Sequence, residues 1–176
     1  MNIRKAKYTD INDIVNLHTS IVDWMSKTNL KQWYYNDIYR LLTIFQINEF
    51  FLLEHDKDII GFVIISQKDI NSCWTNFATN KTLYLYKLAI KREYAKLGYS
   101  QELLNFSKKY GASMGYERIC LLCLKRKNKL VKLYINSNFY CIHESIIQLE
   151  NEPSLFMICN LDKKEKMYAN EKKKNL

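Results

Sequence analysis

The chain is poor in the residues that interrupt folded structure. It has only four glycines and one proline in 176 residues, so no stretch has the composition of a flexible linker. No apolar run approaches the ~20 residues that a membrane-spanning helix needs, and the N-terminus lacks the apolar core of a secretory signal. We therefore expect one domain over residues 1–161, in the cytoplasm and away from membranes, followed by a tail over 162–176.

The sequence also lacks a second set of metal ligands. It has five cysteines, of which Cys120 and Cys123 have metal-ligand spacing. These two lie inside the strand-like run ICLLCL, with no second cysteine or histidine pair at a matching spacing. We expect reduced thiols buried in a sheet and no bound metal.

Basic residues exceed acidic ones and give a net charge of +9. A basic balance admits a polyanionic partner such as nucleic acid. However, the lysine-rich tail over 162–176 has no arginine and a single aromatic residue, Tyr168, and the chain shows no helix-turn-helix signature. Nucleic acid is therefore not the expected partner.

Hydrophobic residues make up 48% of the chain, and their spacing predicts secondary structure. A strand over 2–6 is followed by a helix of ~17 residues that starts at Thr9-Asp10, with Thr9 as its N-cap. His18 lies on the apolar stripe of this helix, where we expect a packed, hydrogen-bonded side chain. A second amphipathic helix is expected over 34–45.

Two further strands, over 50–53 and 59–66, are expected to form an antiparallel hairpin. Gly61 in the second strand indicates a bulge or a close backbone approach. A polar loop over 67–82 then carries Trp74 and Phe77, and loops of this length are often functional.

The second half of the chain alternates strands and helices. A strand over 83–90, a helix ended by Gly115 and a strand over 118–124 predict a parallel pair with a crossover helix. A helix over 128–136 and two antiparallel strands, over 140–149 and 155–161, follow, with Asn151-Glu152-Pro153 in the last turn. The expected inner positions of the two helices are Leu103, Leu104, Ser107, Gly111 and Met114 in the first, and Leu130, Val131, Tyr134 and Ile135 in the second.

The predicted order is β-α-α-β-β-β-α-β-α-β-β. It indicates an α/β fold with a mixed, mostly antiparallel sheet of about seven strands and helices on both faces.

The stretch from Leu83 to Ser100 predicts an anion site. An apolar strand runs through a charged turn and Gly98 into an amphipathic helix. The N–H groups of such a loop converge with the unpaired N–H groups of the helix start, where the helix dipole favours negative charge. We expect a phosphate-bearing cofactor to bind there.

Two segments carry a family resemblance that extends from Asn2 to about Leu161. LAIKREYAKLGYSQELL, residues 88–104, resembles the cofactor motif of the GNAT superfamily of acetyl-CoA-dependent N-acetyltransferases. That motif is a strand followed by Arg/Gln-x-x-Gly-x-Gly/Ala and a helix; Ala95 and Ser100 depart from it. KNKLVKLYINSNF, residues 127–139, resembles the second signature, a helix with a tyrosine five residues before a phenylalanine.

The resemblance implies that acetyl-CoA binds and that a neutral primary amine attacks its thioester directly. The pantetheine arm would pair along the strand, and the pyrophosphate would bind backbone N–H groups of the loop. Tyr134 would protonate the departing thiolate, and Asn128, one residue after the family's usual asparagine, would contact the cofactor. The implied cofactor-binding residues of strand and loop are Leu88, Ala89, Ile90, Ala95, Lys96, Leu97, Gly98, Tyr99 and Ser100.

The tryptophans resemble those of a bacterial GNAT subgroup with a tryptophan-rich acceptor side. This implies a substrate-binding role for Trp24, Trp33, Trp74 and Tyr86, beside the alternative that these aromatic residues only cap the core. The expected acceptor is the amine of a small molecule or peptide, and the expected assembly is a monomer or homodimer. Asp23, Asp37 and Glu49 can make the pocket locally acidic, although solvated helix charges are expected for each of them.

The sequence leaves several candidates for the group that accepts the proton of the amine. Glu54, His55 and His143 are candidates by type, and water can relay the proton instead, so we expect no indispensable base. Two other functions stay open as well. One is a non-catalytic protein that binds CoA, nucleic acid or an acidic partner; the other is an acyltransferase that uses a longer acyl-CoA.

Overall fold

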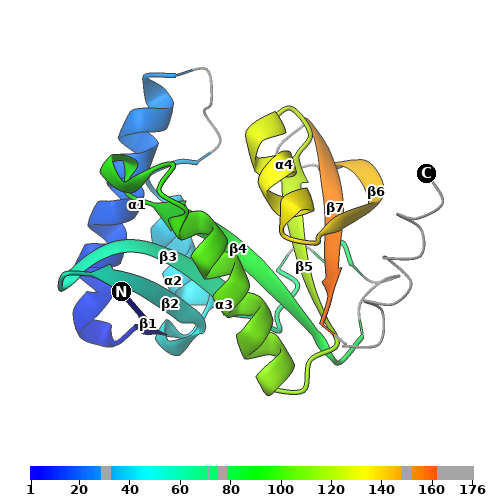
Figure 1. Cartoon of the computed structure of the whole chain (residues 1–176). Helices are drawn as coiled ribbons and strands as arrows, with labels where there is room; N and C mark the ends of the chain where they lie inside the picture. Colours follow the sequence, from blue (N-terminus) through cyan, green and yellow to red (C-terminus); the bar gives the residue numbers. More distant parts are fainter. Residues whose placement is uncertain (29–32, 71, 75–78, 148–151, 162–176) are drawn as a thin grey trace. The chain divides into compact units, whose positions relative to one another are not determined.

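The computed structural model describes residues 1–28, 33–70, 72–74, 79–147 and 152–161. Phe77 and the tail over 162–176 lie outside these residues. The described residues form one sheet of seven strands with four α-helices, in the predicted order (Figure 1). The strands are β1 (Asn2–Lys5), β2 (Phe50–His55), β3 (Asp58–Ser66), β4 (Thr82–Ile90), β5 (Arg118–Leu124), β6 (Tyr140–Ile147) and β7 (Glu152–Asn160).

The helices are α1 (Ile11–Ser26), α2 (Asp37–Ile44), α3 (Tyr99–Ser113) and α4 (Asn128–Asn136), with single 3-10 turns η1 (Tyr8–Asp10), η2 (Ile47–Glu49) and η3 (Arg92–Tyr94). The strands lie in the order β1-β2-β3-β4-β5-β7-β6. The pairing of β4 with β5 is parallel, and the pairings of β1 with β2, β2 with β3, β5 with β7 and β6 with β7 are antiparallel. The predicted fold class is confirmed.

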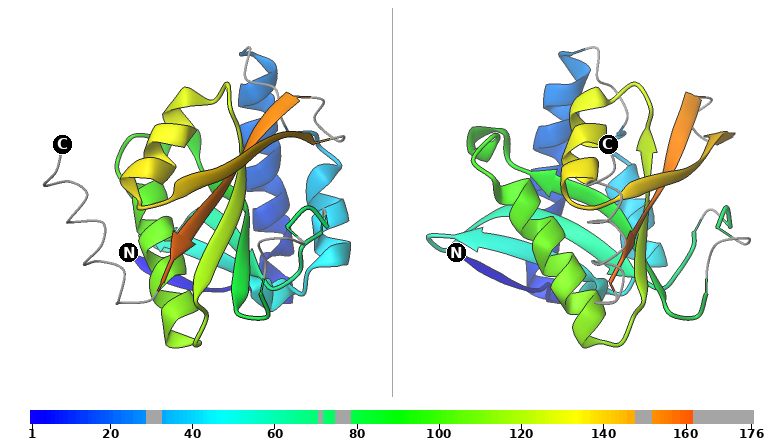
Figure 2. Two further views of the ribbon diagram at one scale, coloured as in Figure 1. Left: turned by 90° about the vertical axis from the view of Figure 1, so that its right-hand side faces the viewer. Right: turned by 45° about the vertical axis from the view of Figure 1, so that its right-hand side comes forward.

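The chain divides into two compact units, and β4 and α3 each contribute to both. The first unit is Met1–Ser66 with Leu85–Ser107. In it, α1 and α2 lie on one face of β1, β2 and β3, and α3 lies on the other (Figures 1 and 2). Successive side chains of a strand face opposite sides, so Phe50 and Phe51 fill both layers. The Phe51 ring lies 5.2 Å from Phe106 of α3, and Phe50 lies 6.3 Å from Phe62.

Gly61 confirms the predicted close approach in β3. A Cβ atom there would lie 2.5 Å from Ile90 Cδ1 and 2.7 Å from the carbonyl oxygen of Ala89. Real Cβ atoms do not come this close to a neighbouring main chain, so only glycine lets β3 and β4 lie this near to each other.

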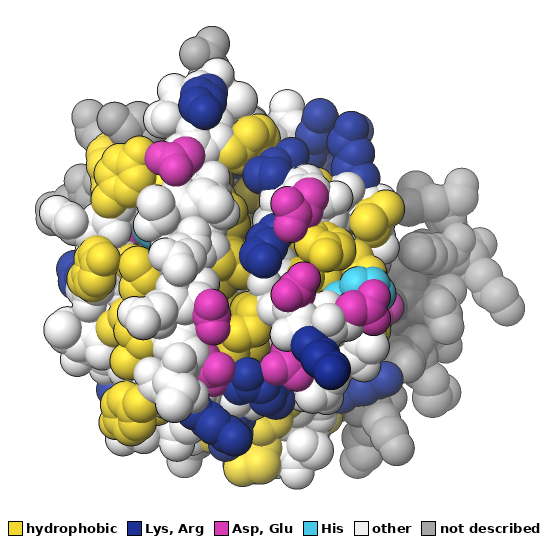
Figure 3. Space-filling model, turned by 90° about the vertical axis from the view of Figure 1, so that its left-hand side faces the viewer, with side chains coloured by type: hydrophobic (Ala, Val, Ile, Leu, Met, Phe, Trp, Pro, Cys, Tyr) yellow, Lys and Arg dark blue, Asp and Glu magenta, His cyan; other side chains and the backbone are white. Residues whose placement is uncertain are grey.

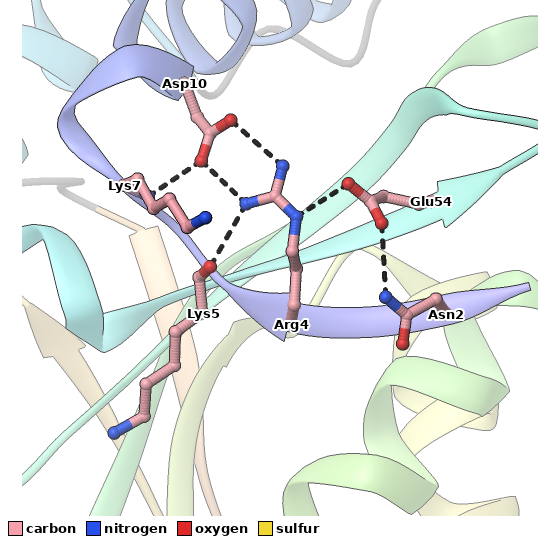
Figure 4. Close-up of polar contacts among 6 residues, drawn as sticks. All are labelled: Asn2, Arg4, Lys5, Lys7, Asp10 and Glu54. Atoms are coloured by element: carbon pink, nitrogen blue, oxygen red, sulfur yellow. Dashed lines mark hydrogen bonds and ion pairs between the residues drawn. The ribbon is translucent and has the colours of Figure 1, made fainter.

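Ion pairs join the N-terminal strand to the rest of the first unit. Arg4 contacts both Asp10 and Glu54, and Asn2 donates to Glu54 as well (Figure 4). Figure 3 shows one face of the molecule, on which basic side chains lie beside acidic ones. Charges on that face are interspersed rather than sorted by sign.

The second unit is Gln67–Tyr84 with Lys108–Leu176, and its described part ends at residue 161. Here β5 is the central strand, between Thr82–Tyr84 of β4 and the whole of β7. Figure 2 shows β6 beside β7 at the end of this sheet. Gly115 has a φ of 80° and ends α3, as predicted.

Several predicted details are wrong. Thr9 is not an N-cap, because the chain makes the turn η1 first and α1 begins after Asp10. Met114 follows the end of α3 and is 59% exposed. Of the expected inner positions of α4, Leu130 and Ile135 are exposed, and the helix buries Tyr134. Pro153 belongs to β7 and not to a turn, since its carbonyl accepts a bond from the N–H of Lys125.

Candidate active site

The loop between η3 and α3 presents a row of main-chain donors. Lys96 and Gly98 have φ angles of 68° and 88°, so the backbone turns left-handed twice within three residues. The N–H groups of residues 96–100 donate no hydrogen bond to any described residue, whereas those of Gln101 and Glu102 both bond the carbonyl of Gly98. Successive N–H groups around left-handed residues, here at the N-terminus of a 15-residue helix, are the backbone arrangement from which anion-binding concavities are built.

Ala95 lies at the edge of this row. Its N–H donates to the carbonyl of Arg92 at 3.1 Å and closes the turn η3. The main-chain donors without an acceptor among the described residues therefore begin at Lys96. Leu97, in the middle of the row, is 64% exposed, which leaves the loop accessible.

The end of β4 is irregular. Lys87, in the second half of the strand, has a φ of 48°, a left-handed conformation that a non-glycine residue rarely adopts. The pairing of β4 with β5 ends at Tyr84, well before the strand ends at Ile90. Within the predicted segment, Ala89 is buried, while Leu88 and Ile90 are half-buried.

Two of the predicted acceptor-side aromatic residues lie against cations of the first unit. The Arg92 guanidinium lies 3.7 Å from the ring centroid of Trp24, and Lys87 Nζ lies 4.5 Å from that of Trp33. Tyr86 packs against Phe45, with ring centroids 5.0 Å apart. These contacts use the rings as cation-binding and packing surfaces.

Asp37 is not the solvated helix charge that we expected. Its Oδ2 atom lies 2.7 Å from Lys87 Nζ, and both side chains are largely buried. Desolvation raises the pKa of the Asp37 carboxyl, but hydrogen bonding and charge from Lys87 outweigh it and hold that pKa below its ordinary value. The other two acidic candidates accept hydroxyl bonds: Asp23 from Tyr35 at 2.6 Å and Glu49 from Ser66 at 2.6 Å.

His18 is packed, as predicted, but its ring has no hydrogen-bond partner in the part of the chain that the structure describes. Its ring is fully buried and stacks on Trp33 with centroids 5.4 Å apart and planes 4° apart. Neither ring nitrogen has a partner among the described residues. Burial, reinforced by the positive charge of Lys87, lowers the pKa of His18 to about 4, so the imidazole is neutral near pH 7.

In the second unit, Tyr134 is the buried residue of α4 and is 9% exposed. Its ring meets Phe139 edge-on at 5.9 Å. Burial, and to a smaller extent the neighbouring Cys123, raises the pKa of the phenol well above its ordinary value. Asn128 is exposed at the start of α4, and Lys127 before it is buried.

Trp74 lies in the core of the second unit. It is 2% exposed and packs against Phe156 and Tyr84, with ring centroids 5.0 Å and 6.1 Å away. Its predicted contact with substrate stays a prediction.

The three candidate bases have different surroundings. Glu54 is held by Arg4 and Asn2. His55 contacts the rings of Tyr94 and Tyr99. In the second unit, His143 lies against Phe156, with ring centroids 5.4 Å apart.

Sequence reasoning missed Lys87 and Arg92 as parts of the site. A signal for Lys87 was available, because it is the one charged residue in the run LYLYKLAI. Its pairing with Asp37, 50 positions earlier, depends on tertiary structure. Among the described residues, no group of three or more His, Cys, Asp or Glu side chains could hold a metal ion, and no described helix is long and apolar enough to span a membrane.

The comparisons with known proteins agree on the fold. The chain resembles a GNAT-family acetyltransferase from Listeria monocytogenes, with a TM-score of 0.73 at 18% identity over 90% of this chain and 94% of that one. It also resembles the ribosomal-protein-S18-alanine N-acetyltransferase from Escherichia coli, with a TM-score of 0.68 at 13% identity over 92% and 94% of the chains. The PaiA N-acetyltransferase from Thermoplasma acidophilum, in complex with coenzyme A, matches with a TM-score of 0.70 at 15% identity over 90% and 98%.

No curated protein sequence matches this chain. The family model described as acetyltransferase (GNAT) family matches residues 17–139, which is more than half of the sequence and includes both segments that carried the resemblance. The chain therefore belongs to the GNAT family of acetyltransferases.

Proposed function

We propose that this protein transfers the acetyl group of acetyl-CoA to a primary amine of a small molecule or peptide. The observation that carries the proposal is the row of N–H groups over residues 96–100, left without acceptors among the described residues at the start of α3. Membership of the acetyltransferase family supports it, as does the similar fold of a relative that binds coenzyme A.

The pyrophosphate of the cofactor would be held by the N–H groups of Lys96, Leu97, Gly98, Tyr99 and Ser100. These donors belong to the main chain, so the family's usual side chain at position 95 is not needed for them. The dipole of α3 adds a favourable field for negative charge at the same place. Gly98 supplies the left-handed backbone without a Cβ penalty.

The main chain of Leu88, Ala89 and Ile90 would hold the pantetheine arm as an added strand. Two observations support this: the backbone is irregular at Lys87, and the pairing of β4 with β5 ends at Tyr84. A strand can pair with an added strand only along an edge that has no neighbouring strand. Acetyl-CoA supplies an activated thioester, and an N–H group near Ile90 would polarise its carbonyl.

Tyr134 would donate the proton that the departing sulfur needs. Burial keeps the phenol protonated across the neutral range, so the proton is present on every turnover. The same burial makes the phenol a weaker acid, and we therefore expect its contribution at the low end of general acid catalysis, about 10²-fold. Tyr134→Phe should lower kcat by that factor and leave acetyl-CoA binding unchanged.

We propose no single indispensable base, and water would carry the proton from the amine. Glu54 is already engaged in an ion pair with Arg4. Substituting His143 by Gln or Glu54 by Gln should leave turnover measurable. Loss of turnover in either variant, with acetyl-CoA binding intact, would identify a required base.

The direct test is release of CoA thiol from acetyl-CoA in the presence of a panel of primary amines. The panel should include amino acids, diamines, an aminoglycoside and a peptide with a free N-terminus. We expect release that depends on both the protein and one class of amine, reduced about 10²-fold in Tyr134→Phe. Binding of acetyl-CoA with no release for any amine would instead indicate a non-catalytic CoA-binding protein.

A further inference from the structure

Two side chains of the first unit, Asp37 and Trp33, contact the ammonium group of Lys87, and a third, His18, stacks on Trp33. Lys87 of β4 places its Nζ atom 2.7 Å from Asp37 of α2 and 4.5 Å from the ring centroid of Trp33, and His18 of α1 stacks on the same indole. We refer to Asp37, Trp33 and His18 as the ammonium cage. A carboxylate beside an aromatic face is the combination that recognises alkylammonium groups.

The His18 imidazole gives an independent indication of a ligand. It is 0% exposed, yet neither ring nitrogen has a hydrogen-bond partner among the described residues. Buried polar groups without partners are rare in native proteins and cost free energy. A neutral imidazole has one lone pair that can accept a bond from an N–H donor. The cage therefore offers an acceptor that Lys87 leaves unused.

The chemistry of the cage selects a cation over an anion. The carboxylate of Asp37, the face of Trp33 and the lone pair of His18 all favour positive charge. An anion would be attracted to Lys87, but the ammonium group of Lys87 is already paired with Asp37. The anion would also lie beside the Asp37 carboxylate, at a cost in repulsion.

We propose that the ammonium cage is a binding subsite for a primary alkylammonium group, which Lys87 occupies in the ligand-free protein and which a cationic acceptor takes over. Lys87 directly precedes Leu88, so the residue that occupies the subsite is next in sequence to the segment proposed to hold acetyl-CoA. Naming the ligand as the acceptor rests on the proposed function; the ammonium site itself does not.

The proposal narrows the acceptor class. The amine that attacks the thioester must be unprotonated, whereas the group held by Asp37 and Trp33 is charged. The acceptor therefore carries a second ammonium group, as a diamine does. A chain with a net charge of +9 repels a polycation overall. The carboxylate and the aromatic face of the cage supply the local negative potential that lets such a cation bind.

The test is calorimetric titration of the full chain with propylammonium chloride, against sodium chloride at the same ionic strength. In wild type, Lys87 competes from within the molecule at millimolar or higher effective concentration, so binding should be weak. Lys87→Met removes the competitor and should tighten binding at least about tenfold. Lys87→Arg keeps a cation and should behave as wild type does. Adding Asp37→Asn to Lys87→Met should abolish the gain.

Equal binding in wild type and Lys87→Met would overturn the proposal, as would a gain that survives Asp37→Asn. Lys87→Asn is a second variant, because asparagine tolerates the left-handed backbone at this position and is too short to reach the cage. Acetyl-CoA binding, measured separately by thermal shift, reports on the proposed function. An intact acetyl-CoA shift without tighter propylammonium binding would reject the subsite alone; the reverse result would reject the acetyltransferase proposal alone.

Discussion

Arg4 Nη1 lies 2.7 Å from Asp10 Oδ2, and Nε of the same guanidinium lies 2.6 Å from Glu54 (Figure 4). This one side chain joins β1 to the turn before α1 and to β2. Arg4→Met should lower the free energy of unfolding by about 2 kcal/mol, because it leaves the nearly buried carboxylate of Asp10 without its cation. Urea unfolding measures this, and Arg4→Lys should recover part of the loss.

The same pair predicts how stability changes with acid. The hydrogen bond from Arg4 holds the pKa of the Asp10 carboxyl below its ordinary value of 3.8. A depressed carboxyl pKa stabilises the folded state fully above the unfolded pKa, and the contribution is lost as pH falls through the folded pKa. The difference in unfolding free energy between wild type and Arg4→Met should therefore be constant above about pH 5 and shrink below about pH 4. A difference that stayed constant to pH 2 would show that Asp10 does not titrate with the pair.

His18 predicts a second pH effect, in a higher range. Its pKa is about 4 in the folded protein against an ordinary 6.5, so the unfolded chain binds more protons between these values. The contribution of neutral His18 to the free energy of unfolding is therefore fully present above about pH 6.5, and it is lost as the pH drops toward 4. His18→Phe keeps a ring against Trp33 and removes the titration, so between pH 7 and pH 5 it should lose about 2 kcal/mol less than wild type. Parallel curves for the two proteins would contradict a neutral, buried His18.

Gly61 and Gly111 should respond differently to the same substitution. A Cβ at Gly61 meets the backbone oxygen of Ala89 at 2.7 Å, which cannot move aside, so Gly61→Ala should cost about 1–3 kcal/mol. A Cβ at Gly111 meets Leu161 Cδ1 at 2.7 Å, the flexible end of a side chain, and alanine favours the helix. Gly111→Ala should be close to neutral. Equal losses in thermal unfolding would show that crowding at Ala89 is not the cause.

The regular elements could be predicted because their patterns are local. Alternating and continuous apolar runs located β2, β3 and β5, and α4 begins and ends at the predicted residues. The errors lie where another contact decided the outcome. The Asp10 carboxylate pairs with Arg4 and accepts a bond from the N–H of Lys7, and Thr9 therefore does not cap the helix. Pro153 continues β7 because the N–H of Lys125, which follows β5, donates to its carbonyl.

Part of the site could also be predicted, because its sequence pattern is local. The loop that ends at Ser100 is a local signal, since a strand, a glycine and a helix start are contiguous in sequence. The engagement of the Ala95 N–H within η3, however, depends on a turn that the pattern does not mark. The ammonium cage takes His18 from α1 and Asp37 from α2, and Lys87 of β4, which has a left-handed backbone, occupies it. No periodicity or motif predicts that positions 18, 37 and 87 will meet.

The central claim is that the loop over residues 96–100 binds acetyl-CoA, and thermal unfolding with and without saturating acetyl-CoA tests it most directly. Gly98→Ala is the variant and Gly115→Ala its matched control, since both glycines have left-handed backbones and open space around the missing Cβ. At 100 times the dissociation constant, binding adds about 2.7 kcal/mol, a rise of about 5–10 °C for a chain of this size. We predict this rise for wild type and Gly115→Ala and a smaller one for Gly98→Ala. No rise in folded wild-type protein, or equal losses in the two variants, would contradict the assignment of the loop.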